Sequence, residues 1–458
     1  MFVSSGDQML IHSSRLMLLE ADFVRFLGAD GLGNPFENSL PRCQLQRLRD
    51  HATNLCKIYS VSGHRPIAHW IDTLCIPVAA HLKDYRKLAI RLLGRTFHKA
   101  TAVLVLDREL CLFQSQKASI FELGIRIMCS GWMKRLWTLQ EAALAAESPD
   151  SRGKMYFQMG DGPVLWNKLS QTFEHKPSRP RPHPPKLNAL TTTIYEVKSR
   201  LNFEFGVLVS MNDRLPSIRD LQKPGPDTHF QRLSRAVQNR STSKSEDEPI
   251  CLASLIGLDV ADILSVQTAA ERMSQFYLLL REIPTAIIFP QLGVKNLLSK
   301  NLQDAPFRWA PKSLLLLDEP VGIDIILGKH RFSEAGHRTC GICEADGLHI
   351  QHNGFVLCEQ AVLREMCTIE DTDSGAKYCL KWDGKPDRLH RDMALIFQTD
   401  VCSDVAVVCI EERRGSGDET EFYVTIVGHG EVEVNETPAE DEVIRGVLTI
   451  PDQKWCIT

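Results

Sequence analysis

An uninterrupted apolar run, ATAVLVLD at 100–107, is the feature that most restricts the fold of this chain. Such a run is typical of a strand buried on both faces, because a half-exposed strand alternates apolar and polar residues. Strands of that kind occur in parallel sheets, where crossover helices cover both faces. A helical repeat precedes the run at 87–97, and a second helix is expected at about 133–147. The run therefore predicts an open α/β sheet in the first part of the chain.

Two acidic residues stand where predicted strands of this sheet end. Asp72 closes the short strand-like segment IAHWID (67–72), and Asp107 closes the run at 100–107. In open parallel sheets, ligands bind in the crevice beyond the carboxyl ends of the strands, so both carboxylates are candidates for ligand contact. An acidic side chain in this position also commonly caps the following helix, and the sequence leaves that alternative open.

The composition of the chain changes along its 458 residues, a length that fits about two to four domains. The segment HKPSRPRPHPPK (175–186) is rich in proline, which continues neither a helix nor a central strand, so a linker is expected there. Helical patterns follow the linker, with helices expected at 230–240, 250–264 and 269–283, and alternating runs typical of antiparallel strands follow the helices. We expect an α/β domain at 1–171, a proline-rich linker at 172–190, a mainly helical region at 191–330 and a β-rich region at 331–458.

Charge and hydropathy exclude several classes of protein. With a net charge of −4, the chain has no basic field to attract nucleic acid or an anionic membrane. Its apolar runs are too short and too often interrupted for a membrane-spanning helix, and its N-terminus lacks the pattern of a signal peptide. The fourteen cysteines form no compact framework and are expected to be reduced thiols. The expected protein is cytoplasmic, with neither nucleic acid nor a membrane as partner.

One cysteine pair deserves comparison with metal sites. The segment HRTCGICEADGLHIQH carries Cys340 and Cys343, followed by His349 and His352. Two cysteines and two histidines can hold zinc, but the spacing from Cys343 to His349 is short for a zinc finger. The residues around the histidines alternate as in a β-hairpin, with an Asn-Gly turn at 353–354. The sequence therefore favours a hairpin and predicts no metal site.

The segment RLWTLQEAALA (135–145) places a carboxylate on an apolar helical face. Trp137 and Glu141 are four residues apart, which is about one helical turn, so their side chains are neighbours. A solvated glutamate is expected on the opposite face of such a helix. Two interpretations follow: Glu141 lines a pocket at the edge of the buried stripe, or it pairs with Arg135 or Lys134 and supports the helix.

Three stretches occur in an order that resembles a known family. They are ADGLGNPFENSLPRCQLQRL (29–48), HWIDTLCIP (69–77) and SGWMKRLWTLQEAALA (130–145). Together they resemble the heterokaryon incompatibility (HET) domain of filamentous fungi, with a core at about 22–148. The segment at 239–259 is similar to segments that follow HET domains. The resemblance implies a role in nonself recognition and programmed cell death.

The HET family is thought to be related to TIR domains, which have a flavodoxin-like doubly wound fold. Many TIR domains cleave NAD⁺ at its nicotinamide bond, using a glutamate four residues after a tryptophan. Trp137 and Glu141 have this spacing, with Thr138 in place of the usual cysteine, so the resemblance implies that Glu141 is catalytic. A carboxylate can stabilise the oxocarbenium-like transition state of glycosidic cleavage. NAD⁺ would be the substrate, and no cofactor is implied.

The same resemblance and the strand ends supply candidates for substrate binding. Arg135 offers a planar fork for a dinucleotide phosphate, whereas Trp137 is more typical of core packing than of stacking. TIR-type enzymes work as assemblies, so self-association is implied, together with a protein partner in incompatibility signalling. The substrate-binding candidates are Asp30, Asp72, Asp107, Arg135, Trp137 and Gln140.

The N-terminal element departs from the family pattern. The segment FVRFLGADGLGN (23–34) keeps Asp30 but lacks the serine and tryptophan that usually precede it in HET domains. The loop after the first strand would border the nucleotide pocket, so this departure bears on activity more than on fold. It favours a second hypothesis, in which a degenerate HET domain is a non-enzymatic module that oligomerises or binds a partner.

Overall fold

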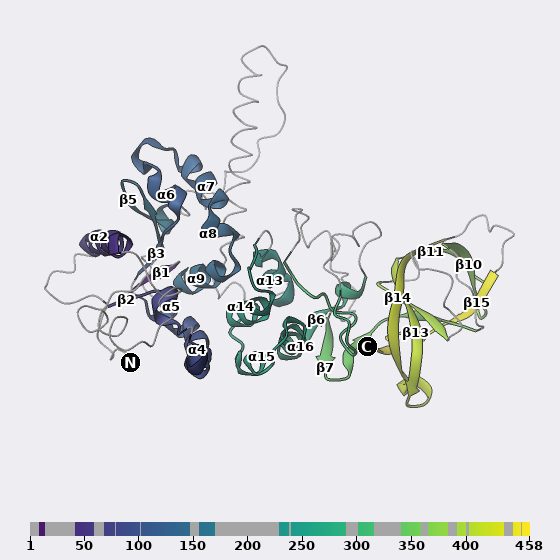
Figure 1. The fold of residues 1–458 in the computed structure, drawn as a ribbon. Helices are drawn as coiled ribbons and strands as arrows, with labels where there is room; N and C mark the ends of the chain where they lie inside the picture. The colour runs from purple at the N-terminus through teal and green to yellow at the C-terminus, as the bar shows by residue number, and fades with distance from the viewer. Residues whose placement is uncertain are drawn as a thin grey trace, which may run out of the picture. The chain divides into compact units, whose positions relative to one another are not determined.

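The computed structural model of the chain divides into two compact units (Figure 1). The first unit comprises Met1–Lys223, Arg240–Ser243 and Ser254–Leu264, and the second comprises Pro224–Asn239, Lys244–Ala253 and Ser265–Thr458. Within them the structure describes residues 9–13, 42–58, 68–77, 79–100, 102–146, 155–169, 229–237, 240–289, 301–315, 340–358, 365–382, 392–399, 403–434, 443–449 and 451–458. The expected proline-rich linker at 172–190 lies outside these residues.

The first unit contains a five-stranded sheet in the order β2-β1-β3-β4-β5. Strands β1 to β4 are parallel, and β5 returns antiparallel to β4. The apolar run at 100–107 forms β3, whose four residues are fully buried, so the predicted α/β sheet with a strand buried on both faces is confirmed. The strands are β1 (Met9–Ser13), β2 (Ala68–Trp70), β3 (Ala102–Val105), β4 (Met155–Met159) and β5 (Gly162–Leu165).

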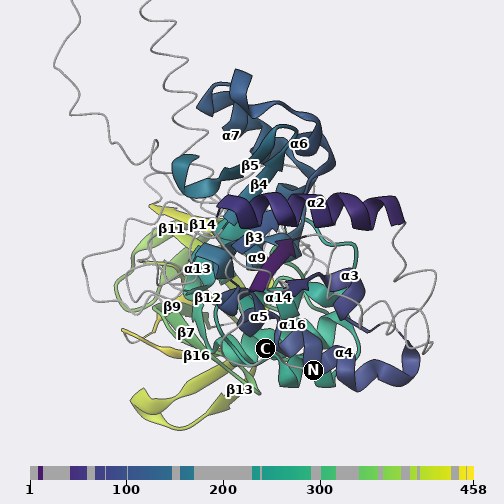
Figure 2. The ribbon, with the colours of Figure 1, turned by 90° about the vertical axis from the view of Figure 1, so that its left-hand side faces the viewer.

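Helices pack on both faces of this sheet. On one face, Leu55 of α2 (Arg42–Ile58) joins a core cluster with Leu104 of β3 and Tyr156 of β4. Figure 2 shows α2 lying in front of β3 on this side. On the other face, Trp132 packs edge-on against Phe157 of β4, with 5.3 Å between the ring centroids. The other α-helices that the structure describes between residues 72 and 146 are α3 (Asp72–Cys75), α4 (Lys83–Arg91), α5 (Leu93–Lys99), α6 (Arg108–Leu112), α7 (Ile120–Cys129), α8 (Gly131–Lys134) and α9 (Leu136–Ala146).

Two expected helices are interrupted, and both interruptions were missed by the periodic pattern. The helix expected at 87–97 is divided into α4 and α5 at Leu92. The helix expected at 133–147 is divided at Arg135, whose backbone is extended with φ −86° and ψ 137°. The pattern predicted the burial of Leu93 and Phe97 but not that Leu88 is exposed, and it missed these breaks because apolar spacing continues unchanged across them.

The helices that lie in the sequence between the strands of the first sheet and those of the second also differ from their expected bounds. The expected helix at 230–240 ends at Val237, as α13 (His229–Val237). The expected helix at 250–264 is divided into α14 (Glu248–Leu255) and α15 (Ala261–Ser265), with Gly257 at φ 77° between them. This left-handed backbone ends α14, since glycine adopts it without a steric penalty. The expected helix at 269–283 begins as predicted but ends early, as α16 (Ala269–Leu280).

The second unit is dominated by an eleven-stranded, mostly antiparallel sheet, so the predicted β-rich C-terminal region is confirmed. Its order is β11-β10-β15-β9-β12-β13-β14-β16-β8-β7-β6, and β11 also pairs with β14. Because of that second pairing, the strands from β11 to β14 form a closed ring. The strands are β6 (Glu282–Pro284), β7 (Cys340–Glu344), β8 (Gly347–Gln351), β9 (Gly354–Leu357), β10 (Met366–Asp371), β11 (Lys377–Trp382), β12 (Met393–Phe397), β13 (Asp404–Arg414), β14 (Glu421–Val434), β15 (Val443–Leu448) and β16 (Lys454–Ile457).

Alternate residues of these strands form the core of the ring. Val405, Val407 and Cys409 of β13 belong to one buried cluster with Leu395 of β12 and Phe355 of β9. A period of two places such residues on the same face of a strand. The closed ring also leaves these strands without an unpaired edge.

A buried carboxylate anchors the start of α14 in the second unit. Glu248 is 3% exposed and accepts hydrogen bonds from the Ser313 hydroxyl and from the Leu314 N–H, both at 2.7 Å. Burial raises the pKa of Glu248 above its ordinary value, while the hydrogen bonds from Ser313 and Leu314 oppose the rise.

We expect the Glu248→Gln variant to lose a pH dependence of stability that the natural protein shows. A raised pKa means that the folded protein binds this proton more tightly than the unfolded chain does. The contribution of Glu248 is therefore most favourable below the unfolded pKa of about 4.3 and declines as the pH rises through the raised folded pKa. Hydrogen exchange of the α14 amides between about pH 4 and pH 8 measures it. An unchanged slope in the variant would contradict this assignment.

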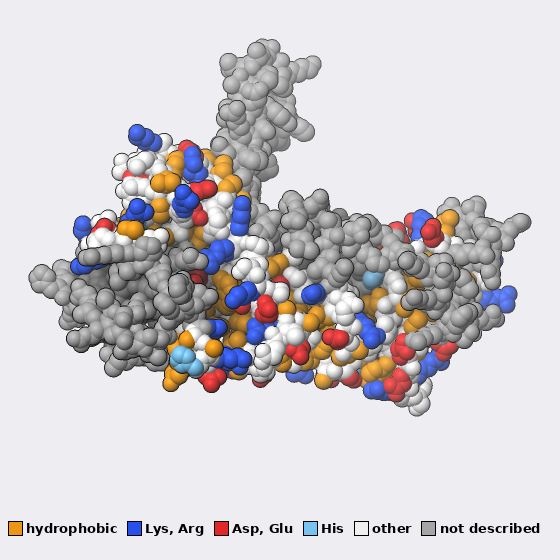
Figure 3. Space-filling view, in the orientation of Figure 1, with side chains coloured by type: hydrophobic (Ala, Val, Ile, Leu, Met, Phe, Trp, Pro, Cys, Tyr) orange, Lys and Arg blue, Asp and Glu red, His pale blue; other side chains and the backbone are white. Residues whose placement is uncertain are grey.

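The described residues include no helix that is both long enough and apolar enough to cross a membrane. On the face shown in Figure 3, acidic and basic side chains are interspersed over the described surface of each unit.

Candidate functional site

The helix α9, which carries Glu141, is buried on almost every described side. Leu136, Leu139 and Ala143 are fully buried, and Glu141 itself is only 8% exposed. Trp137 is the exception, since it is half-buried. The helix packs against α5, α8 and β4. Glu141 therefore does not lie at the edge of a narrow apolar stripe, as the sequence pattern indicated, but within a helix that is buried all round.

A bridge to a distant segment explains why the chain breaks before α9. The N–H of Leu136 donates to the carbonyl oxygen of Ser241 at 2.9 Å, and the N–H of Ser241 donates to that of Lys134 at 2.7 Å. These bonds form a parallel β-bridge between Arg135 and Ser241. Arg135 is extended because it takes part in this bridge. Residues 134–136 and Ser241, which are far apart in the sequence, thus meet in the first unit.

The same bridge brings a buried arginine to α9. Arg240 is 3% exposed, and its guanidinium donates to the carbonyl oxygen of Arg135 at 2.9 Å and to the Thr138 hydroxyl at 3.3 Å. The Thr138 hydroxyl also lies 2.5 Å from the carbonyl oxygen of Trp132. Residues three apart on a helix share a side, so Glu141 lies on the side of α9 that Arg240 contacts. Glu141, in the middle of α9, and the Arg240 guanidinium, beside its first turn, are thus both shielded from water.

Asp107 has a structural task at the carboxyl end of β3. One of its carboxylate oxygens accepts hydrogen bonds from the N–H groups of Glu109 at 3.0 Å and Leu110 at 3.3 Å, which caps α6. The other accepts from the N–H of Trp132 at 3.2 Å. The helix-capping alternative therefore describes the contacts of Asp107. They also fix the start of α8, and hence the approach to α9, against the end of β3.

We expect the Asp107→Ala variant to destabilise the first unit by about 1–2 kcal/mol, the usual cost of losing an N-cap. Asp107→Asn should cost less, because its amide oxygen can still cap α6. Hydrogen exchange of the α6 and α7 amides measures the effect. Asp84→Ala is the control, because Asp84 is an exposed acid in the first turn of α4. Equal effects of Asp107→Ala and Asp84→Ala would contradict the capping role.

The other predicted binding residues differ in their surroundings. Asp72 is the first residue of α3, directly after β2, and is half-buried. It shares the carboxyl edge of the sheet with Asp107, since β2 and β3 flank β1 in parallel. The Arg135 side chain is exposed, and Gln140 is 2% exposed. Asp30 lies outside the described residues.

The sequence analysis did not predict that Arg240 is buried against α9 in this unit. No local signal marks it, because the surrounding pattern is that of the preceding helix. A cysteine beside Asp107 adds no nucleophile: burial, followed by the negative charge of Asp107, raises the pKa of the Cys111 thiol. The thiolate is the reactive form of cysteine, so this group is poorly suited to attack.

A surface depression of about 430 Å³ lies along α6 and α7. Its wall includes an ion pair between Glu122 and Arg126 at 2.8 Å, and Arg126 also lies 3.8 Å from the ring centroid of Phe113. The depression is lined by Glu109, Leu110, Ser119, Phe121, Glu122, Ile125, Arg126 and Cys129, and so does not contain Glu141.

The described cysteine and histidine residues of this segment, within 340–352, lie in a hairpin other than the one that the sequence predicted. Strands β7 and β8 form an antiparallel hairpin. Cys340 and Cys343 are three residues apart in β7, so their side chains point to opposite faces. His349 pairs with Ile342 on β7 and with Cys456 on β16. Cys340 and Cys343 therefore cannot hold one ion together from this strand.

The prediction of an Asn-Gly hairpin turn at 353–354 is wrong. The turn of the β7–β8 hairpin lies before Gly347, whereas 353–354 connects β8 to β9. These two strands do not pair with each other, since β8 pairs with β7 and β16, and β9 with β12 and β15. Strands far away in the sequence pair with β8 and β9 instead: β16 pairs with β8, and β12 and β15 pair with β9.

Comparison with known proteins adds no relative to this picture. No family model, no curated protein and no solved structure matches the chain. The assignment of a function rests on the motifs quoted above and on the geometry of the two units.

Proposed function

We propose that this chain is a HET-domain protein of fungal nonself recognition and programmed cell death, and that its first unit hydrolyses NAD⁺. The observation that carries the proposal is the burial of Glu141, 8% exposed, on the side of α9 that the buried Arg240 contacts. Its position four residues after Trp137 is that of the glutamate in TIR-type enzymes.

The layout of the first unit supports a TIR-like, doubly wound fold. Strands in the order β2-β1-β3-β4, all parallel, follow the arrangement of flavodoxin-like sheets. Leu55 packs on one face of this sheet and Trp132 on the other, as two helical layers require. In such sheets a ligand binds beyond the carboxyl ends of the strands, where Asp72 and Asp107 lie.

The proposed reaction needs one well-placed carboxylate. The bond between nicotinamide and the ribose C1′ breaks, nicotinamide leaves with the bonding electrons, and the ribose becomes oxocarbenium-like. Glu141 stabilises this developing positive charge, and its burial strengthens the interaction because water does not screen it. Water then forms the new bond at C1′ and releases a proton to solvent. Arg240 acts as a positioning residue, since it holds the first turn of α9.

The remaining candidates bind the dinucleotide in this proposal. Arg135, whose side chain is exposed, contacts a phosphate, and the half-buried Trp137 lies beside the ribose. Asp30, Asp72 and Gln140 complete the set, whereas Asp107 contributes through the helix cap described above. NAD⁺ is a substrate, and no cofactor takes part.

The proposal is tested by incubating the purified chain with NAD⁺ at high protein concentration and measuring nicotinamide release. Assembly is expected to accompany activity, so light scattering is recorded on the same samples. Release of nicotinamide in equal amount to the NAD⁺ consumed supports hydrolysis. A folded, self-associating protein that leaves NAD⁺ intact overturns it.

One observation favours a second candidate, a non-enzymatic module that oligomerises or binds a protein partner. Both carboxylate oxygens of Asp107 are engaged by backbone N–H groups. With Glu141 buried as well, these acids have the character of structural residues. In this alternative the protein acts in the cytoplasm through contacts with further copies or with a signalling partner, without nucleic acid or membrane. Self-association without NAD⁺ turnover is the result that it predicts.

A further inference from the structure

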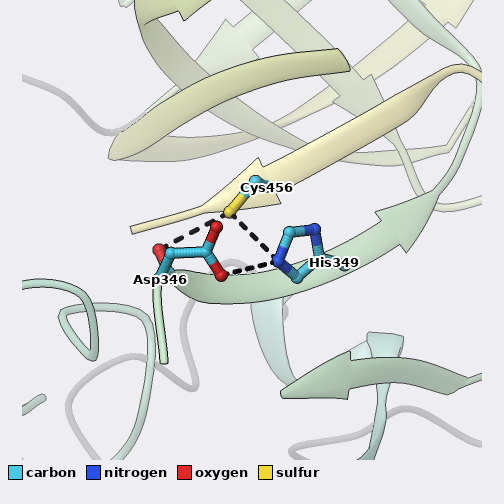
Figure 4. A group of neighbouring side chains, drawn as sticks. All are labelled: Asp346, His349 and Cys456. Carbon is cyan, nitrogen blue, oxygen red and sulfur yellow. Dashed lines mark hydrogen bonds and ion pairs between the residues drawn. The ribbon is translucent and has the colours of Figure 1, made fainter. Parts of the chain in front are cut away.

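Three potential metal ligands converge at the end of the β7–β8 hairpin in the second unit (Figure 4). His349 comes from β8, Cys456 from β16, and Asp346 from the turn before β8. The His349 Nε2 lies 2.9 Å from the Asp346 Oδ1 and 3.7 Å from the Cys456 Sγ. One ligand atom from each residue lies within 4.8 Å of the others. The cluster thus offers one nitrogen, one sulfur and one oxygen to a common point.

Strand register places these side chains together. Cys456 is the direct partner of His349 on β8 and of Tyr423 on β14, so the three residues form a row across neighbouring strands. Direct partners in a sheet project from the same face. Ligands carried by paired strands are held more firmly than ligands carried by loops.

Gly347 brings Asp346 to this row. Its φ is +152°, and a Cβ at this position would lie 2.7 Å from the Cys456 Sγ. Only glycine lets the turn pass so close to the sulfur. The close approach carries the Asp346 carboxylate to the edge of the cluster.

Further side chains hold the ligands in the orientation that a metal needs. The His349 Nδ1 lies 2.8 Å from the Glu421 Oε1, and the Tyr423 hydroxyl donates to the Asp346 Oδ2 at 3.0 Å. A metal-binding histidine usually donates its second ring N–H to a carboxylate, and ligating carboxylates are themselves hydrogen-bonded. The outer contacts therefore leave the Nε2 of His349 facing both the Asp346 Oδ1 and the Cys456 Sγ.

The donor set selects the ion. Sulfur and imidazole nitrogen are ligands for zinc, whereas calcium and magnesium take oxygen ligands. Zinc is tetrahedral in proteins, and three protein ligands leave its fourth position to water. Solvent reaches the cluster at Asp346, whose side chain is 48% exposed, whereas Cys456 is fully buried.

A nucleophilic cysteine is the competing interpretation, since Cys456, His349 and Glu421 lie in the order of a thiol, a base and an orienting acid. Two observations oppose it. The Cys456 residue has no exposed surface for a substrate to reach, and the His349 Nε2 is closer to Asp346 than to the sulfur.

We propose that Asp346, His349 and Cys456 bind one zinc ion, with water as the fourth ligand and with Glu421 and Tyr423 orienting the histidine and the aspartate. This site differs from the zinc set considered for Cys340 and Cys343, because its sulfur ligand is Cys456 of β16. It is independent of the activity proposed for the first unit.

The test uses the full chain, freed of metal by a chelator and then titrated with Zn²⁺ against a chromogenic competitor and, separately, with Co²⁺. We expect one tightly bound ion per chain, a sulfur-to-cobalt charge-transfer band, and slower hydrogen exchange in β8 and β16 when Zn²⁺ is bound. A wild-type protein that binds no ion, or binds cobalt without the sulfur band, overturns the proposal.

Matched variants locate the site. Cys456→Ser should abolish the sulfur band and stoichiometric binding, whereas Cys340→Ser, on neighbouring β7, should retain both. Glu421→Gln keeps all three ligands and should weaken Zn²⁺ binding by about 10- to 100-fold, the usual effect of losing an orienting carboxylate. This variant tests the site even where Cys456→Ser does not fold. Undiminished affinity in Glu421→Gln, or loss of binding in Cys340→Ser, contradicts the assignment.

Discussion

The Glu141→Gln variant is expected to hydrolyse NAD⁺ about 100- to 1,000-fold more slowly than the natural protein, with the loss in kcat rather than in KM. Glutamine keeps the shape of the side chain but removes the charge that stabilises the oxocarbenium-like ribose in the proposed reaction. Removing one preorganised electrostatic group from an active site typically has an effect of this size. The loss falls on kcat because the interaction is made in the transition state.

The control for this variant is Glu122→Gln, which removes an acid from α7 in the same unit. Glu122 has a side chain that is 44% exposed and pairs with Arg126 on the surface. Its replacement should leave NAD⁺ hydrolysis nearly unchanged. Since Glu141 is buried, hydrogen exchange of the α9 amides must accompany the assay, so that a loss of folding is not mistaken for a loss of chemistry. A well-folded Glu141→Gln protein with natural activity would refute the catalytic role.

The second large effect is expected at Arg240. We expect Arg240→Ala to lower the local stability of α9 by about 2–4 kcal/mol, because the variant leaves buried acceptors unsatisfied and opens a cavity. The acceptors are the carbonyl oxygen of Arg135 and the hydroxyl of Thr138. Hydrogen exchange of the α9 amides measures the change directly. Because Arg240 also positions the turn before Glu141, NAD⁺ hydrolysis should fall with it.

Two companion variants separate structure from charge at this position. Arg240→Lys keeps the positive charge but loses the planar fork that reaches two acceptors, so it should recover only part of the stability. Arg126→Ala removes an arginine whose side chain is 46% exposed, and the expected cost is below about 1 kcal/mol. Equal protection of α9 in Arg240→Ala and Arg126→Ala would show that Arg240 does not hold this helix.

Several elements of the fold were predictable because their signals are local. Four consecutive apolar residues in Ala102–Val105 predicted a strand buried on both faces, and β3 is fully buried. The start of α16 was also predicted, and in the structure Thr268 and Glu271 form a capping box at its first turn. Apolar period and end-capping chemistry act within a few residues, so a sequence displays them directly.

Other features depend on residues far apart in the chain and are not visible in any local pattern. The break at Arg135 exists because Ser241 hydrogen-bonds across it. The prediction of an Asn-Gly hairpin turn at 353–354 failed for the same reason, since β8 pairs with the distant β16 and not with β9.

The candidate sites divide along the same line. The sequence by itself proposed Glu141 as a candidate, from its spacing to Trp137 and the resemblance that this spacing carries, together with the acids at the strand ends. Only the tertiary structure placed Arg240 against α9 and Cys456 beside His349, because strand register and long-range backbone bonds decide which distant side chains meet. The apolar period of a segment indicates which of its residues are buried. The residues of a site come together through the pairing of distant segments, and this pairing is decided only when the whole chain folds.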